Sequence, residues 1–209
     1  VDLGVELKLN APLGPDFGLR ELRELGFEAV FLGVGTQRGR ELTVEGSDLD
    51  GVVKAIDFLL NVNHGYRVSL GKKVLVIGGG FVAFDAARMA LRAAVEAEPG
   101  SMVAALDAAR SAVRAGVADV RMVSLESFDE MPVLRTAQGR EEFEQAQREG
   151  IHFHPQRGIR RLAGEGGKVR AVELMGVQRT YDEQGRFSPV YDPQVSETLE
   201  ADTVILAIG

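Results

Sequence analysis

The stretch Lys73–Ala83, KVLVIGGGFVA, decides which fold we expect. A β-branched run ends on three glycines, and the alanine-rich stretch Val82–Ala94 that follows consists of strong helix formers. Gly78, Gly80 and Ala83 match the pattern G-x-G-x-x-[GA] at a turn from a strand into a helix. There the first glycine permits a tight turn, the second lets a pyrophosphate approach the backbone, and the small third residue lets helix and strand pack. We therefore predict a dinucleotide-binding turn; the alternative is a glycine-bearing turn without a ligand.

A dinucleotide-binding unit also needs an acidic residue after the next strand, where it binds the ribose 2′-hydroxyl. The next predicted strand, Val120–Val123, leads into Ser124 and Glu126, later than usual because a helix predicted over Met102–Ala115 lies in the crossover. We predict that Glu126 binds the ribose and repels the 2′-phosphate of NADP, and that Ser124 touches the adenosine ribose. A solvated carboxylate or helix cap is the alternative for Glu126, and a hydroxyl within a turn is the alternative for Ser124.

Composition excludes several classes of function. The 209 residues include 25 glycines, where average usage of about 7% would give about 15, together with 45% hydrophobic residues. This combination indicates a globular domain with many tight turns. The 31 acidic residues outnumber 24 basic ones, which disfavours nucleic acid and anionic membranes as partners. No cysteine is present, so this segment offers no disulfide, thiol nucleophile or iron–sulfur ligand. No signal peptide or membrane-length apolar run is present, which predicts a cytoplasmic location.

Two apolar runs closed by glycine flank the central unit. Val5–Leu9 alternates apolar and charged residues and predicts a short strand, while Ala29–Gly35 and Ala201–Gly209 predict buried strands. After the central unit, the sequence favours a hairpin around residues 164–167. His152 and His154 share one face of a predicted strand, but no third metal ligand is evident, so we interpret them as structural and predict no metal site.

The order of these motifs resembles the small subunit of glutamate synthase and related flavin- and iron–sulfur-containing NAD(P)H oxidoreductases, including part of dihydropyrimidine dehydrogenase. The likeness covers nearly the whole chain. The residues that carry it are Ala29–Gly35, Gly51–Val53, Ala55–Leu59, Val74–Gly80, Ala83, Asp85–Arg88, Glu130–Pro132 and Ala201–Gly209.

This resemblance implies an α/β, Rossmann-like NAD(P)-binding domain of the two-dinucleotide, glutathione-reductase-type flavoprotein fold, with a small β-hairpin or meander. In that fold an NAD(P)H-binding domain is inserted into an FAD-binding domain. Residues 1–35 would then be a flank and crossover from the FAD-binding domain, and residues 36–209 the NAD(P)H-binding domain, ending at the return crossover strand. Because two crossovers bracket the domain, we disfavour FAD itself as the ligand of Gly78–Gly80.

The implied function is hydride transfer from nicotinamide to flavin, with electrons passing on to iron–sulfur centres or a partner subunit. The cofactors carry this chemistry, so we nominate no catalytic residue. FAD would belong to the complete protein, and the fragment alone would be inactive. The alternative is a non-catalytic nucleotide-sensing or assembly subunit with the same fold. The predicted cofactor-binding residues are Gly78, Gly79, Gly80, Phe81, Val82, Ala83, Ser124, Glu126 and Gly209.

Three departures from the family pattern affect the cofactor and the reaction. Leu125 and Glu126 stand where the family usually has two arginines suited to a 2′-phosphate, so we expect NADH rather than NADPH. Phe81 occupies a position where asparagine is common. The insertion Glu96–Ala115 is not typical of the family's core members, and the physiological reaction therefore need not be glutamate synthesis.

Overall fold

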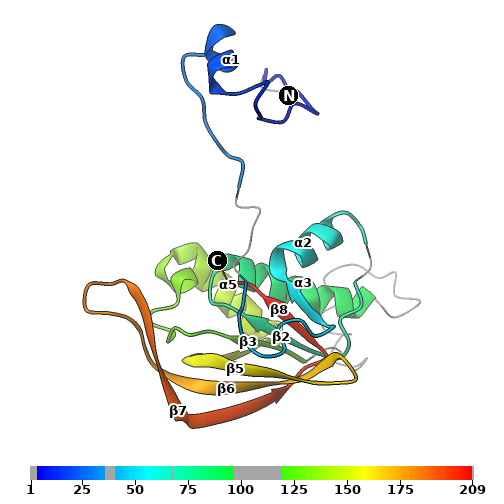
Figure 1. Ribbon diagram of the computed structural model, residues 1–209, viewed down its shortest axis with the longest axis vertical. Helices are drawn as coiled ribbons and strands as arrows, with labels where there is room; N and C mark the ends of the chain where they lie inside the picture. The colour runs from blue at the N-terminus through cyan, green and yellow to red at the C-terminus, as the bar shows by residue number, and fades with distance from the viewer. Residues whose placement is uncertain (1–3, 36–40, 67, 97–118, 209) are drawn as a thin grey trace. The chain divides into compact units, whose positions relative to one another are not determined.

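The computed structural model describes residues 4–35, 41–66, 68–96 and 119–208 (Figure 1). The chain divides into two compact units, Val1–Thr36 and Gln37–Gly209. The helix predicted over Met102–Ala115 and the insertion around it lie outside the described residues. No helix within the described ranges has the length and apolar character needed to cross a membrane.

The larger unit is built on a five-stranded parallel sheet with the strand order β1-β8-β2-β3-β4. Its strands are β1 (Val52–Lys54), β8 (Thr203–Leu206), β2 (Lys73–Ile77), β3 (Asp119–Val123) and β4 (His152–His154). From β2 the chain moves to β3 and β4 on one side, whereas β8 and β1 lie on the other side. The boundary between β2 and β8 is therefore the topological switch point, where open parallel sheets bind their ligands beyond the carboxyl ends of the strands.

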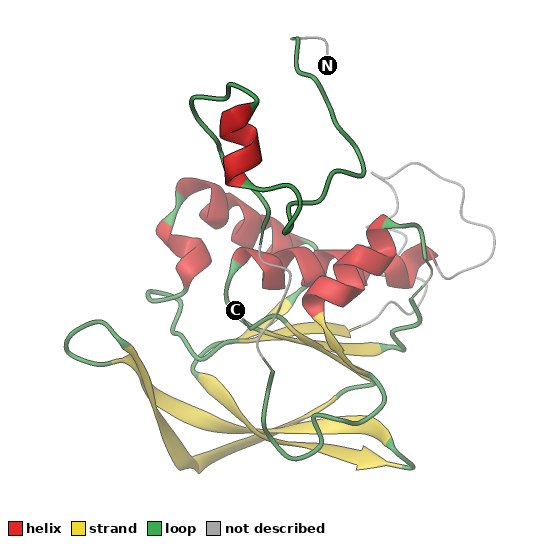
Figure 2. Ribbon diagram, turned by 45° about the horizontal axis from the view of Figure 1, so that its top comes forward, coloured by secondary structure: helices red, strands yellow, loops and turns green. Residues whose placement is uncertain are grey.

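Helices cover one face of this sheet, and a three-stranded antiparallel sheet covers the other (Figure 2). The helices are α2 (Ala55–Asn63), α3 (Phe81–Glu96) and α5 (Ala137–Arg148), with a short 3-10 helix η1 (Pro132–Arg135) before α5. Strand β2 shows why both faces are covered. Val74 and Val76 are buried with Phe84 and the alanines of α3, while Leu75 and Ile77 point to the opposite core. A central strand that is apolar on both faces needs a layer on each side.

The antiparallel sheet is the meander β5 (Arg157–Glu165), β6 (Lys168–Tyr181) and β7 (Phe187–Glu200). Leu162, Val172, Leu174 and Leu199 from this meander form the second core with the strand residues above. The far end of the β6–β7 hairpin extends past the sheet edge in Figure 1. The predicted α/β fold with a small meander is thus confirmed, and the meander supplies one of the two hydrophobic cores.

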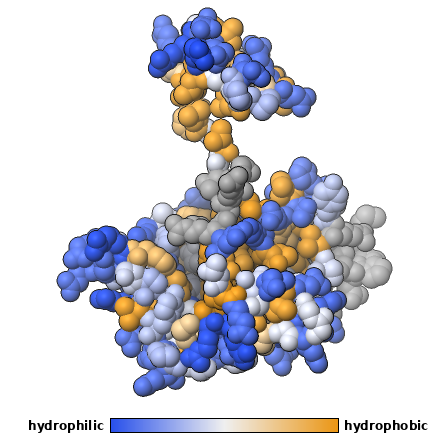
Figure 3. Space-filling view, in the orientation of Figure 1, coloured by the Kyte–Doolittle hydropathy of each residue, from blue (hydrophilic) through white to orange (hydrophobic). Residues whose placement is uncertain are grey.

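The smaller unit contains one helix, α1 (Leu19–Glu24), and Gly26 follows it with a φ of +92°. The strands predicted over Val5–Leu9 and Ala29–Gly35 are wrong for this chain, because neither segment is in a strand. A β-strand is defined by ladder pairing with a neighbouring strand, and neither sheet of the described residues includes these segments. Many apolar side chains of the unit lie at its surface (Figure 3), and Phe31 is 96% exposed.

One smaller correction concerns Val52–Asn61, whose helical periodicity predicts a helix that begins at Val52. Residues Val52–Lys54 form strand β1, and α2 begins at Ala55. Parallel pairing of Val52 with Val204 in β8 overrides the local helical periodicity. The strand predicted within Ala201–Gly209 is confirmed as β8, which covers Thr203–Leu206.

Candidate functional site

The turn after β2 lies at the switch point of the sheet, and Gly78 is its first residue. Gly78 has a φ of +144°, a conformation that side-chain-bearing residues rarely adopt. A Cβ atom at Gly78 would lie 2.5 Å from the carbonyl oxygen of Ala207, which follows β8, and 3.2 Å from the Cβ of Ala83. Position 78 therefore requires a glycine for two reasons: the backbone has a positive φ there, and β8 and α3 approach it too closely for a side chain.

The next two glycines differ from Gly78 and from each other. A Cβ at Gly79 would lie 3.1 Å from Cγ of Met131, 3.2 Å from Cβ of Ser124 and 3.3 Å from Oε2 of Glu126. Gly79 is thus packed tightly against the segment that follows β3. Among the described residues, and apart from the adjoining chain itself, no atom lies within 4 Å of the position that a Cβ at Gly80 would take. Packing does not require a glycine there, so the open space beside Gly80 is available to a ligand.

Helix α3 begins at Phe81, directly after this open space. Among the described residues, none accepts a hydrogen bond from the backbone N–H groups of residues 79–82. Such unpaired N–H groups at a helix N-terminus, together with the positive end of the helix dipole, bind phosphates. Phe81 and Val82 have exposed side chains, whereas Ala83 is fully buried against the sheet.

The turn after β3 brings Glu126 to the glycine turn, as the distance of 3.3 Å between its Oε2 and the position of a Cβ at Gly79 shows. Strand pairing causes this approach, because β3 and β2 are parallel neighbours with Val123 opposite Ile77. Ser124 is buried, and its hydroxyl donates a hydrogen bond of 2.9 Å to the carbonyl oxygen of Glu126. The hydroxyl of Ser124 therefore shapes the turn, which is one of the alternatives expected from the sequence. Gly209, the last predicted site residue, lies outside the described residues.

Other residues around this turn were not predicted from the sequence. Met131, of the motif Glu130–Pro132, is buried beneath Gly79. Thr180 of β6 donates from its hydroxyl to the carbonyl oxygen of Leu125 at 3.0 Å. The backbone N–H of Gln156 donates to the carbonyl oxygen of Glu126 at 3.1 Å. No local sequence pattern links these positions to the turn, because Met131 reaches it through the pairing of β3 with β2, Gln156 from the segment before β5, and Thr180 from β6.

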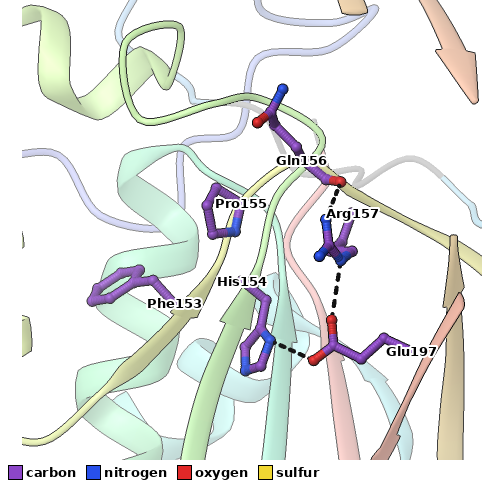
Figure 4. A pocket seen from close by; sticks show the side chains of 6 residues that line it. All are labelled: Phe153, His154, Pro155, Gln156, Arg157 and Glu197. Atoms are coloured by element: carbon purple, nitrogen blue, oxygen red, sulfur yellow. Dashed lines mark hydrogen bonds and ion pairs between the residues drawn. The ribbon is translucent and has the colours of Figure 1, made fainter. Parts of the chain in front are cut away.

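A second concave region lies beside β4, with a volume of about 380 Å³ (Figure 4). Glu197 of β7 contacts two side chains there: its Oε1 lies 2.9 Å from Nδ1 of His154, and its Oε2 lies 3.0 Å from Nε of Arg157. These contacts join β7 to the edge of the parallel sheet. His152 is exposed on the same strand. Within the part of the chain that the structure describes, no three potential metal ligands of the His, Cys, Asp or Glu type cluster together.

Together, the glycine turn at the switch point, the helical layer and the meander define the α/β fold of the two-dinucleotide flavoprotein oxidoreductases. The chain belongs to the pyridine nucleotide-disulphide oxidoreductase family, whose model matches residues 8–209.

Two relatives show where the chain stands within this family. It is 34% identical over 219 residues to the glutamate synthase [NADPH] small chain of Halomonas elongata, and the match covers all of this chain and 40% of that relative. It is 32% identical over 212 residues to the NADPH-Fe(3+) oxidoreductase subunit beta of Geobacter sulfurreducens, covering 99% of this chain and 27% of the relative. The chain therefore spans less than half the length of these relatives.

A solved structure has the same fold. Mycobacterium tuberculosis FprA in complex with NADPH matches with a TM-score of 0.58 and 21% sequence identity. The match covers 92% of this chain and 52% of the FprA chain. The predicted resemblance to the glutamate synthase small subunit is thus confirmed by sequence, and the predicted fold is confirmed by structure.

Proposed function

We propose that residues 36–209 form the NAD(P)H-binding domain of an FAD-dependent, glutamate synthase small subunit-like oxidoreductase. The arrangement at Gly80 supports this proposal best. An open space, a row of N–H groups with no acceptor among the described residues, and the N-terminus of α3 coincide at one point of the switch region. This combination fits a pyrophosphate, which needs close access to the backbone and donors for its oxygens.

The chain's own residues would bind and orient the nucleotide. The N–H groups of residues 79–82 would donate to the pyrophosphate, and Ala83 would hold α3 close to the sheet so that its N-terminus points at the ligand. The nicotinamide supplies a hydride, which a flavin accepts without a protein acid or base. For this reason we assign no catalytic residue to the chain, and electrons would continue to iron–sulfur centres or a partner subunit.

Glu126 is the residue on which the choice of nucleotide would depend. Its carboxylate lies beside Gly79, at the side of the turn where the adenosine ribose of a bound dinucleotide would follow the pyrophosphate. A carboxylate accepts hydrogen bonds from ribose hydroxyls and repels a 2′-phosphate. We therefore propose NADH as the preferred nucleotide, although both relatives named above carry NADPH in their names.

The exposed apolar side chains of the smaller unit support the proposal that this chain is part of a longer protein. Residues 4–35 expose large apolar side chains such as Leu9, Phe27 and Phe31, and they include no strand although the apolar run Ala29–Gly35 is present. Exposure of this extent indicates a missing partner surface. We propose that residues 1–35 belong to an FAD-binding domain that completes their packing, in a cytoplasmic enzyme with an iron–sulfur domain or subunit.

Calorimetric titration of the 209-residue chain with NADH and with NADPH tests the proposal. We expect weak binding with NADH tighter, and absence of binding of both nucleotides at millimolar concentration would overturn it. In the Glu126→Arg variant, a contact between the arginine and the 2′-phosphate of NADPH replaces the repulsion between the carboxylate and that phosphate. Because a charged hydrogen bond contributes about 1.5–3 kcal/mol, the preference should move toward NADPH by about tenfold or more.

A matched control separates a local effect from a general change in charge. Asp129 is an exposed carboxylate on the same loop, three positions beyond Glu126. The Asp129→Arg variant changes the net charge by the same amount and should leave the preference nearly unchanged. If both variants shift it equally, the long-range field and not contact with Glu126 determines the preference. Anaerobic bleaching of the flavin by NADH in the full-length protein would separate the oxidoreductase from a nucleotide-sensing subunit, which would show none.

A further inference from the structure

The backbone of the turn that carries Glu126 is held at three consecutive carbonyl groups. The carbonyl of Ser124 accepts a hydrogen bond from the N–H of Arg157 at 2.9 Å, and that of Glu126 accepts from Gln156. The carbonyl of Leu125, between them, accepts from the hydroxyl of Thr180 at 3.0 Å. The first two donors are backbone N–H groups, which every residue except proline supplies. Only the third of these bonds comes from a side chain of another element.

Thr180 is fully buried and lies on β6, 55 positions further along the chain than Leu125. Its two neighbours on β6, Arg179 and Tyr181, are less buried. The hydrogen bond to the carbonyl oxygen of Leu125 directs the hydroxyl of Thr180 toward the segment that follows β3. A buried hydroxyl is costly unless it is hydrogen-bonded, and this one makes its bond to the peptide that immediately precedes Glu126.

We propose that Thr180 is a positioning residue that sets the discrimination between NADH and NADPH through Glu126. This inference rests on the proposed function. The carbonyl of Leu125 and the N–H of Glu126 belong to one planar peptide group, so a rotation of that group changes ψ of Leu125 and φ of Glu126, and a change in φ of Glu126 redirects its side chain. Loss of the hydroxyl leaves the partly buried carbonyl without its donor, and the peptide turns to regain a partner. The carboxylate of Glu126 then leaves its place beside Gly79.

The test compares three variants of the 209-residue chain by calorimetric titration with NADH and NADPH. Thr180→Val keeps the shape of the side chain and removes the hydroxyl, whereas Thr180→Ser keeps the hydroxyl. Thr203→Val is the matched control, because Thr203 is also buried and donates its hydroxyl to a backbone carbonyl, that of Leu70, at 2.5 Å. Thr203 begins β8, at the opposite end of the parallel sheet from the glycine turn.

The measured quantity is the ratio of the Kd for NADPH to the Kd for NADH. In Thr180→Val we expect this ratio to fall about fivefold, because NADH loses an aligned acceptor and NADPH meets less repulsion. Thr180→Ser and Thr203→Val should keep the wild-type ratio even where they lower the melting temperature. A purely structural role of Thr180 would lower the stability of the Thr180→Val variant without changing the ratio.

Each other outcome refutes a defined statement. If Thr180→Val changes the ratio no more than Thr203→Val does, Thr180 does not position Glu126, while the proposed nucleotide binding stands. If the wild-type chain binds both nucleotides equally, Glu126 does not discriminate, and the inference about Thr180 fails with it. If the wild-type chain binds neither nucleotide, the proposed function fails as well. A Thr180→Val variant that does not fold while Thr180→Ser also loses the wild-type ratio would likewise overturn the inference.

Discussion

A methyl group added at Gly80 should abolish most of the nucleotide binding while leaving the fold intact. Among the described residues, and apart from the adjoining chain itself, no atom lies within 4 Å of the position that a Cβ at Gly80 would occupy, and the φ of Gly80 is not in the left-handed region. Alanine at this position therefore meets neither a clash nor strained backbone. The new methyl group would instead fill the space where the pyrophosphate approaches the N–H groups of α3.

Two effects on the stability of the Gly80→Ala variant nearly cancel. Replacing glycine reduces the conformational entropy of the unfolded chain and stabilises the protein by about 0.4–1 kcal/mol. Gly80 also precedes α3, and its carbonyl accepts from the N–H groups of Ala83 and Phe84, which makes it the N-cap. Alanine is a poorer N-cap than glycine by about 0.5–1 kcal/mol. The net change in the free energy of unfolding should therefore stay within about 1 kcal/mol.

The effect on binding should be larger than the effect on stability. A methyl group that displaces the pyrophosphate weakens several hydrogen bonds at once, and we expect the Kd for NADH to rise about tenfold or more, which corresponds to about 1.4 kcal/mol. Calorimetric titration measures the Kd, and urea denaturation followed by circular dichroism measures the free energy of unfolding.

Two further glycine variants make the result interpretable. Gly14→Ala is the matched control, since Gly14 also has open space and no positive φ but lies in the smaller unit. Gly78→Ala should be destabilised by more than about 1 kcal/mol, because the new Cβ meets the carbonyl oxygen of Ala207 and the φ of +144° is unfavourable. Wild-type affinity for NADH in a folded Gly80→Ala variant would refute the assignment of the open space to a pyrophosphate.

Two ion pairs lead to predictions about stability. Arg88 of α3 donates two hydrogen bonds, of 3.0 and 3.1 Å, to the carboxylate of Glu149, which directly follows α5, and both side chains are mostly buried. The Arg88→Ala variant should therefore have a free energy of unfolding that is lower by about 1–3 kcal/mol. An unchanged urea midpoint would contradict this prediction. Arg121 donates to Asp119 and lowers the pKa of that carboxyl below 3.8. Because the folded-state pKa is the lower one, this contribution is present above pH 4 or so and is lost as the pH falls through the folded-state pKa. The difference in melting temperature between the wild type and the Asp119→Asn variant should therefore become smaller as the pH is lowered. A difference that becomes larger at low pH would refute the stabilising role of this ion pair.

Local sequence was sufficient to locate the glycine turn between β2 and α3, which we propose binds a pyrophosphate. The run Val74–Ile77 can be buried only as a central strand, and three glycines followed by a helix former leave one kind of turn. The close packing around Gly79 could not be predicted from local sequence. It depends on Met131 and Ser124, which reach the turn only because β3 pairs with β2. Likewise, the local pattern at Val52 indicated a helix, and pairing with β8 made it a strand.

The sequence by itself determined the glycine turn, the helix after it and the identity of the acidic residue that follows β3. These depend on local properties, namely φ, side-chain size, helix propensity and apolar periodicity. Only the tertiary structure decided that Glu126 lies beside Gly79, that Thr180 holds the peptide in front of it, and that Ala29–Gly35 forms no strand. The physical reason is that hydrogen bonds between strands join residues far apart in the chain, and no local pattern specifies which partner they find.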